Sequence, residues 1–266
     1  MEVILNKIQL FIFDVDGTLL LGSQPLLYAT KVLELLKEKE MDFVIISNNS
    51  SYSPEENKQR LEETLDIELD YSNLFTSIQA SIEYLKKKNI SSSYIVGAPL
   101  MVEEFKRNGI EQNSENPEAI VLGYDKTLTY DKIKTVALLL QRDKRIPFYA
   151  THADKTCPTD DGKIPDVGSF LKMFKEATNR TPDMVFGKPN DIMIKLSMKG
   201  RDIKKSEVLI IGDRLETDIQ MANIASTYSA LVLTGDSNEK DAYESNFKPT
   251  FIWKNLEFLY DFLKNN

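Results

Sequence analysis

Short runs of β-branched and aromatic residues alternate with longer amphipathic stretches along the chain. The first apolar run covers residues 8–13 and ends in an Asp-Val-Asp-Gly-Thr turn. Later runs are found at residues 43–46, 184–186, 208–211, 230–233 and 250–253. Such alternation is typical of α/β proteins, and continuous apolar runs suit a parallel sheet that helices cover on both faces. The pattern therefore predicts a doubly wound α/β core.

The middle of the chain predicts a second α/β unit. Its amphipathic stretches predict helices at residues 78–88, 101–108, 131–140 and 167–178, and its apolar runs predict strands at 94–97, 119–124 and 147–151. Because no linker rich in Gly and Ser flanks this unit, we expect an insertion through short hinges. The expected division is residues 1–76 for the first part of the core, 77–183 for the inserted domain and 184–266 for the second part of the core.

Charge and composition limit the class of partner. The chain has 33 Lys and Arg against 41 Asp and Glu, a net charge of −8, without a basic stripe, which disfavours tight nucleic-acid binding. Its apolar runs are far shorter than the ~20 residues of a membrane span. A single cysteine, Cys157, and the lack of a signal-peptide pattern favour a reducing compartment. We therefore expect a cytoplasmic protein that binds neither nucleic acid nor a membrane.

Polar side chains gather where the predicted core strands end. Ligands bind beyond the carboxyl ends of the strands in open parallel sheets, so residues at these ends are expected to converge on one edge. The residues in these positions are Asp14, Asp16, Ser47, Asn48, Lys188, Asp213 and Asp218.

This set of side chains suits phosphoryl transfer, which needs a nucleophile, a proton donor and positive charge around the phosphate oxygens. Asp14 is the expected nucleophile, and Asp16 is the expected acid and base. The hydroxyl of Ser47 and the backbone N–H of Asn48 are expected to hold phosphate oxygens. Lys188 is expected to neutralise charge from the other side.

Clustered carboxylates repel a phosphate unless a hard cation lies among them. We expect Asp14, Asp16 and Asp213 to bind Mg²⁺, with the backbone carbonyl of Asp16 as one ligand. Asp218 is expected to order a metal-bound water or to anchor Lys188. The chain has no Gly-rich phosphate-binding fingerprint, so no nucleotide cofactor is expected.

Four segments resemble the motifs of the haloacid dehalogenase (HAD) superfamily of phosphatases in order and spacing: residues 14–19, 46–50, 187–189 and 212–218. The doubled Asn48-Asn49 and the Gly187-Lys188-Pro189 triplet resemble the NagD or para-nitrophenyl phosphatase branch. The resemblance covers nearly the whole chain. It implies a Rossmann-like core with a large α/β cap, inserted between the second and third motifs, that supplies substrate contacts.

Two cap segments depart from the pattern of this branch. The branch often has Ala-Thr-Asn-Pro-Asp where this chain has Ala150-Thr151-His152-Ala153-Asp154. Asp166 stands where a glycine is common. His152 and Asp154 are candidates for contacts with the substrate, whose identity these departures leave open.

The leading hypothesis is a magnesium-dependent phosphomonoesterase that hydrolyses a small phosphorylated metabolite, such as a sugar phosphate or phosphoglycolate, through an aspartyl phosphate. Transfer of the phosphoryl group to a second hydroxyl, as in a phosphotransferase or mutase, is an alternative. A catalytically silent regulator is another, although binding alone needs no nucleophile. Dehalogenation fits poorly, because that displacement needs neither magnesium nor an acid at position 16. A monomer and a homodimer are both compatible with the sequence.

Overall fold

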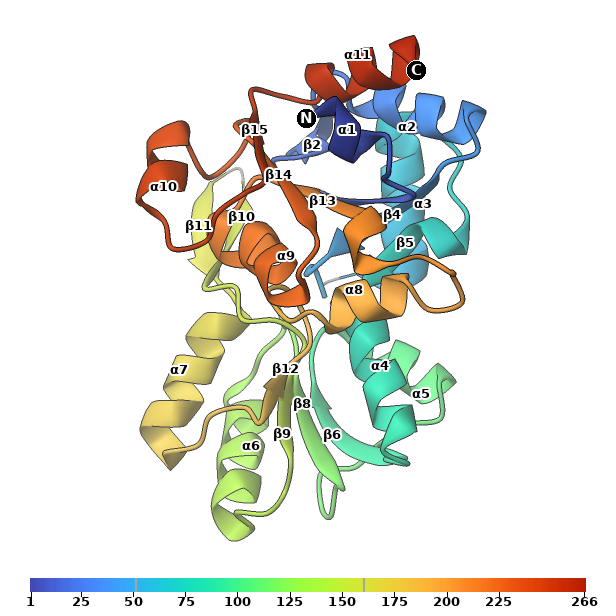
Figure 1. Cartoon of the computed structure of the whole chain (residues 1–266). Coiled ribbons are helices and arrows are strands. Elements are labelled where there is room, and N and C mark those ends of the chain that lie inside the picture. The colour runs from blue at the N-terminus through green and yellow to red at the C-terminus, as the bar shows by residue number, and fades with distance from the viewer. Residues whose placement is uncertain (51, 160) are drawn as a thin grey trace. The chain divides into compact units, whose positions relative to one another are not determined.

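The computed structural model describes residues 1–50, 52–159 and 161–266, which fold as two compact units (Figure 1). The first unit comprises Met1–Ser47, Lys58–Phe75 and Lys188–Asn266. The second comprises Asn48–Asn57 and Thr76–Gly187. Each unit has its own sheet and its own apolar core.

The first unit is built on a six-stranded sheet with the strand order β15-β14-β13-β1-β4-β5. Its described strand pairs are parallel, with Phe13 opposite both Ile45 and Ile211. This arrangement confirms the predicted doubly wound, Rossmann-like class. The strands are β1 (Leu10–Asp14), β4 (Asp42–Ser47), β5 (Leu74–Thr76), β13 (Val208–Gly212), β14 (Tyr228–Val232) and β15 (Phe251–Trp253).

Helices and short turns connect these strands. The helices are α1 (Glu2–Leu5), α2 (Ala29–Glu38), α8 (Ile192–Ser197), α9 (Gln220–Ala225), α10 (Glu239–Glu244) and α11 (Glu257–Asn265), while α3 (Pro54–Leu65) contributes its residues from Lys58 on. The remaining elements are the ribbon β2 (Leu20–Leu21) and β3 (Gln24–Pro25), the 3₁₀ turns η1 (Tyr71–Asn73) and η2 (Lys205–Glu207), and the π-helical turn η3 (Leu215–Ile219).

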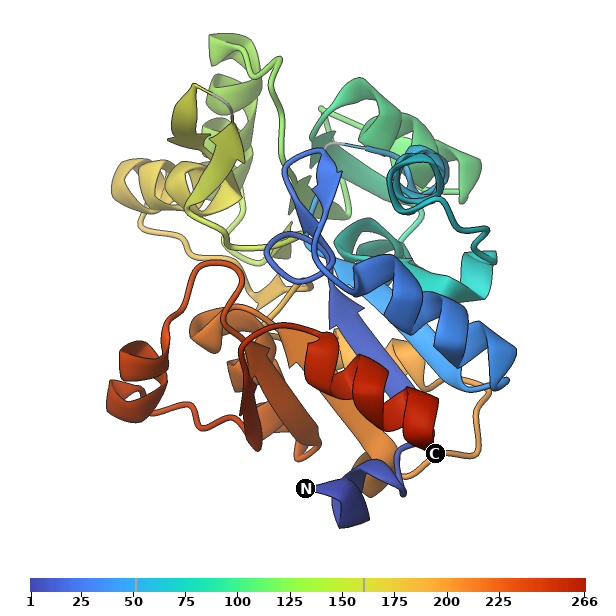
Figure 2. The ribbon, with the colours of Figure 1, turned by 90° about the horizontal axis from the view of Figure 1, so that it is seen from above.

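Alternate residues of the core strands face opposite sides of the sheet. Phe11 and Phe13 of β1 belong to the apolar cluster that α2 and α11 also line, whereas Leu10 and Ile12 are equally buried outside that cluster. Figure 2 shows α2 and α11 packed side by side. Because both faces are covered, the strands have no polar face, which explains their continuous apolar pattern.

The second unit contains a five-stranded sheet with the order β12-β9-β8-β6-β7, all in parallel pairs. Its strands are β6 (Ser92–Val96), β7 (Glu111–Gln112), β8 (Ala119–Leu122), β9 (Phe148–Ala150) and β12 (Met184–Val185). Its helices are α4 (Ser77–Lys87), α5 (Pro99–Arg107), α6 (Tyr130–Arg142) and α7 (Val167–Thr178), and the hairpin β10 (Thr156–Thr159) and β11 (Gly162–Pro165) precedes α7. All four helices predicted for this region are present.

The run at residues 184–186 corrects one prediction. The sequence pattern places it in the core sheet, but Met184 and Val185 pair with Tyr149 and Ala150 in the second sheet. A short apolar strand can complete the edge of either sheet, so periodicity alone does not choose between them. The expected domain limits after residues 76 and 183 otherwise stay a prediction. None of the helices in the described part of the chain combines the length and apolar character needed to cross a membrane.

Candidate active site

The expected nucleophile, Asp14, is the last residue of β1, and a tight turn follows it. Gly17 in this turn has φ +87°, and a Cβ atom there would lie 2.3 Å from Oδ2 of Asp213, so both backbone conformation and space demand glycine. The Thr234 hydroxyl donates a 2.6 Å hydrogen bond to the Gly17 carbonyl. Asp14 is buried, while Asp16 is exposed. The turn therefore brings the end of β1 against the loop that carries Asp213.

Lys188 lies between two carboxylates of the first unit. Its Nζ donates to Oδ1 of Asp14 and, over 2.8 Å, to Oδ1 of Asp218. The lysine side chain is only 5% exposed. Burial alone would lower the pKa of this ammonium, but the charges of Asp14 and Asp218 more than reverse that effect and raise it. The ammonium therefore stays protonated and offsets the two carboxylates.

Asp213 directly follows β13 and has one oxygen bonded and one unpartnered. Its Oδ2 accepts a 2.7 Å hydrogen bond from the backbone N–H of Asp236. Its Oδ1 is buried and has no hydrogen-bond partner among the described residues. Buried polar atoms normally have such partners. A carboxylate oxygen in this state fits a role as a ligand to a cation.

The carboxylates of Asp14, Asp213 and Asp218 meet at one place: their ligand atoms lie within 4.8 Å of one another, and all three residues are buried. Oxygen atoms are the ligands that hard divalent cations prefer, so this set fits such a cation. Asp218, rather than the Asp16 side chain, completes the carboxylate cluster. The magnesium ligands expected from the sequence, Asp14, Asp16 and Asp213, stay a prediction.

The crowding of these acids raises their pKa values. For Asp14, burial raises the pKa well above its ordinary value, Lys188 opposes this, and Asp218, Asp213 and Asp16 add to it. Burial and the neighbouring Asp218 raise the pKa of Asp213 to about 6. A divalent cation among these groups favours their ionised forms. Cation binding would therefore keep the Asp14 carboxylate ionised.

Ser47 is the last residue of β4 and Asn48 follows it, and the two residues belong to different units. Ile46 pairs with Asp14, so the buried Ser47 comes one residue later at the same sheet edge. Asn48 opens the second unit, where its carbonyl accepts a 3.0 Å hydrogen bond from the Ser77 hydroxyl. The structure thus places Ser47 at the edge that carries the acidic cluster, whereas Asn48 is hydrogen-bonded to Ser77 of the second unit.

His152 and Asp154 lie together in the second unit, in a network that the sequence did not reveal. The His152 side chain is 2% exposed, and its Nδ1 lies 3.4 Å from Oδ2 of Asp154. Its Nε2 lies 3.2 Å from the hydroxyl of Ser50, a buried residue to which the sequence pattern assigned no role. The one signal for Ser50 was its place in the Ser-Asn-Asn-Ser-Ser run. Cys157 is half-buried in β10, and no role is assigned to it.

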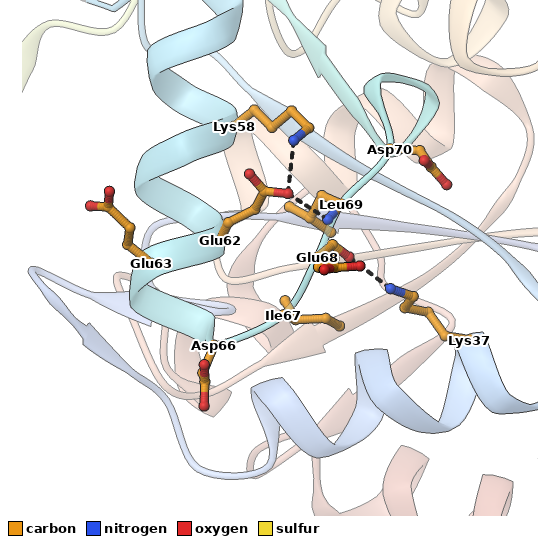
Figure 3. Close-up of a pocket in the computed structure, with 9 residues that line it drawn as sticks. All are labelled: Lys37, Lys58, Glu62, Glu63, Asp66, Ile67, Glu68, Leu69 and Asp70. Atoms are coloured by element: carbon orange, nitrogen blue, oxygen red, sulfur yellow. Dashed lines mark hydrogen bonds and ion pairs between the residues drawn. The ribbon is translucent and has the colours of Figure 1, made fainter.

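A surface pocket of about 730 Å³ lies elsewhere in the first unit (Figure 3). Charged residues of α2, α3 and the segment leading to β5 line it. Lys58 bonds to Glu62 and Lys37 bonds to the Glu68 carbonyl, each over 2.8 Å. Because α2 leads into β4 and this segment leads into β5, the pocket lies towards the amino ends of these strands. It is therefore not a candidate for the chemistry of Asp14.

A parallel α/β sheet with a lysine-bound aspartate and further carboxylates at its carboxyl edge defines a hydrolase for phosphate esters. Residues 11–111 match the family model of haloacid dehalogenase-like hydrolases, and residues 185–259 match a HAD-hydrolase-like model.

Individual relatives match nearly the whole chain. The 4-nitrophenylphosphatase of Thermotoga maritima is 35% identical, with 97% of this chain and 98% of that chain covered and a TM-score of 0.91. The 5'-nucleotidase YutF of Bacillus subtilis is 28% identical over 90% of this chain and 93% of its own length. The glycerol phosphate phosphatase of Mycobacterium tuberculosis, solved with magnesium, is 28% identical over 97% of this chain and 78% of that chain, with a TM-score of 0.88. The chain therefore belongs to the NagD-like phosphatases of the HAD superfamily.

Proposed function

We propose that this chain is a magnesium-dependent phosphomonoesterase that hydrolyses a small phosphate ester through an aspartyl phosphate on Asp14. The observation that carries the proposal is the position of the Asp14 carboxylate, which ends β1, bonds to Lys188 and lies in one cluster with Asp213 and Asp218. Charged groups held together in this way can stabilise the charge that develops on a phosphoryl group during its transfer.

In the proposed reaction, Asp14 attacks phosphorus and Lys188 offsets the negative charge of nucleophile and substrate. Asp16 follows two residues later and is exposed, which leaves it free of the carboxylate cluster. It protonates the leaving oxygen and then activates the water that hydrolyses the acyl phosphate. Magnesium, when bound by the aspartate cluster, supplies positive charge next to the phosphoryl oxygens.

The substrate we propose is a small sugar phosphate or polyol phosphate. The name of the Mycobacterium tuberculosis relative, a glycerol phosphate phosphatase, supports a compact ester. The name of the Bacillus subtilis relative, a 5'-nucleotidase, makes nucleoside monophosphates the second class to test. Related sites on one fold accept different esters, so the substrate has to be measured directly.

The test is phosphate release from a panel of triose, glycerol and hexose phosphates, phosphoglycolate, nucleoside monophosphates and para-nitrophenyl phosphate. Each ester is assayed with Mg²⁺, with Ca²⁺ and with EDTA. Asp14→Asn should abolish release in Mg²⁺, because an amide is not a nucleophile here, while Asp16→Asn should slow it by about 10²–10⁴-fold. Asp131→Asn, the same change on an exposed part of α6, is the matched control.

Three results would contradict the proposal. Release that persists in EDTA would rule out the metal requirement. Release that survives Asp14→Asn would rule out the aspartyl phosphate. A folded protein that is silent on every ester would favour phosphotransfer or regulatory binding instead.

A further inference from the structure

The segments that adjoin Ser47 and Lys188 of the first unit are Asn48–Ser50 and Gly187, and they pack against each other within the second unit. Beyond the β9–β12 pairing, the N–H of Gly187 donates a 2.6 Å hydrogen bond to the Thr151 carbonyl. A Cβ atom on Gly187 would lie 2.4 Å from Oδ1 of Asn48 and 2.8 Å from Cβ of His152. Only glycine permits this approach. His152 therefore lies where the residues next to Ser47 and Lys188 come together.

Polar contacts of His152 reinforce this packing. Its Nε2 reaches the Ser50 hydroxyl at 3.2 Å, and that hydroxyl accepts a 2.9 Å hydrogen bond from the N–H of Tyr124. On the other side of the ring, Oδ2 of Asp154 lies 3.4 Å from Nδ1 and accepts a 3.1 Å hydrogen bond from Nδ2 of Asn48. Within the second unit, the imidazole thus contacts Ser50 directly and is linked to Asn48 through Asp154.

The surroundings of the ring favour its charged form. Among the described residues, the carboxylates that face it are Asp154 and Asp166, the latter 3.7 Å from Nε2. Burial alone would lower the pKa of His152, but these two carboxylates outweigh burial and raise it. Beyond Asp166 lie Tyr124, whose pKa burial raises, and Cys157. The charge of the ring is thus set by Asp154 and Asp166.

We propose that His152, as an imidazolium, is a positioning residue for phosphate binding that fixes the Asn48–Ser50 segment and Gly187. Asn48 and Gly187 are the chain neighbours of Ser47 and Lys188. The inference rests on the proposed function, in which Lys188 offsets the charge of the substrate, and on the expectation that the Ser47 hydroxyl holds a phosphate oxygen. The branch that the sequence resembles often has asparagine at this position, and asparagine carries no charge. The proposal therefore predicts a pH dependence of phosphate binding that belongs to this chain's own histidine.

The charge of His152 can be read directly, because it is the only histidine in the chain. In tag-free protein labelled with ¹⁵N-histidine, NMR should report one imidazole that titrates above its ordinary value of 6.5. Asp166→Asn should lower that pKa, because it removes one facing carboxylate. Asparagine caps helices as well as aspartate does, so α7 should keep its N-cap. An imidazole that is neutral at pH 7 would overturn the proposal.

Binding is measured as KM for the best ester and, by calorimetry, as the affinity for inorganic phosphate in Mg²⁺. His152→Gln should weaken both about tenfold at pH 7, the loss expected for a buried charged contact, with kcat within about threefold. In the native protein the imidazolium is lost as the pH rises through its raised pKa, so KM should rise over that range. In His152→Gln this alkaline rise should be absent.

Three outcomes separate this inference from its alternatives. An unchanged KM, or an alkaline rise that persists in His152→Gln, overturns it even if the variant melts at a lower temperature. If His152→Gln does not fold, Asp166→Asn decides, because it should move the alkaline rise of KM to lower pH. If the native protein releases no phosphate, the proposed function fails, while NMR and phosphate calorimetry still decide the role of His152.

Discussion

Replacing Lys188 by methionine tests the charge balance on which the candidate site depends. Methionine keeps an unbranched apolar stem but removes the ammonium that contacts Asp14 and Asp218. The side chains of the lysine and of these two partners are 5%, 10% and 0% exposed, so water cannot replace the lost contacts. Removing one partner of a buried ion pair destabilises a protein by about 3–5 kcal/mol. We expect a loss of this size for Lys188→Met in EDTA.

The same substitution should also inactivate the enzyme. Lys188 is the group that opposes the burial-raised pKa of Asp14, so its removal raises that pKa further. A protonated Asp14 is a poor nucleophile, and the phosphoryl oxygens lose a preorganised cation. The loss of one such electrostatic contact reduces rates by about 10²–10³-fold, and kcat/KM should fall by at least this factor.

Thermal unfolding and phosphate release measure the two effects. In EDTA the melting temperature of Lys188→Met should fall by about 10 °C. With Mg²⁺ the fall should be smaller, because a cation bound to the same carboxylates offsets their repulsion. Lys195→Met is the matched control, since Lys195 is 60% exposed on α8. Activity within threefold of the native protein, or an unchanged melting temperature in EDTA, would refute the inference that the Lys188 ammonium offsets the charges of Asp14 and Asp218.

Two further predictions concern the loops around Asp213. Gly17→Ala should abolish phosphate release and destabilise the fold, because its Cβ would overlap Oδ2 of Asp213. Gly22 has φ +61° and open space around it, so Gly22→Ala should lower the free energy of unfolding by only about 1–2 kcal/mol in chemical unfolding. Equal losses in the two variants would contradict this prediction. Asp213→Asn should raise the Mg²⁺ concentration for half-maximal activity at least tenfold. In EDTA, the stability of the native protein relative to this variant should fall as the pH rises from about 4 to about 6, because Asp213 has a raised pKa of about 6 and its deprotonation opposes folding; a flat difference would contradict the assignment.

Periodicity predicted the elements well where a single physical signal dominates. Val167–Thr178 has the predicted helix limits, because Asp166 caps its first turn and Asn179 ends it in a left-handed conformation. Five of the six core strands were predicted, because both of their faces are buried, whereas β5, a strand of only three residues, was not. The hairpin Thr156–Thr159 and Gly162–Pro165 was not predicted, since its residues are mostly exposed or polar and give no apolar alternation.

Sheet membership and side-chain partners depend on contacts that are distant in sequence. Met184 and Val185 resemble any short apolar strand, and only their pairing with Tyr149 and Ala150 places them in the second sheet. The contact of His152 with Ser50 could not be inferred from the sequence, because the two residues are 102 positions apart. Residue type and position therefore predicted that Asp14, Lys188, Asp213 and Asp218 gather at the strand ends, but not the network around the histidine.

Asp218 shows why separate roles for neighbouring acids are hard to assign from sequence. The sequence suggested that it anchors Lys188 or orders a metal-bound water, as though these were alternatives. In the structure its Oδ1 bonds to Lys188, and its carboxylate also lies in the cluster with Asp14 and Asp213. Asp14 has the same double position. Each of these two acids can thus lie between the fixed lysine and a bound cation, and for Asp14 the lysine charge lowers the pKa that burial raises. Charge at Asp14 is therefore a property of the whole cluster, which no single motif encodes.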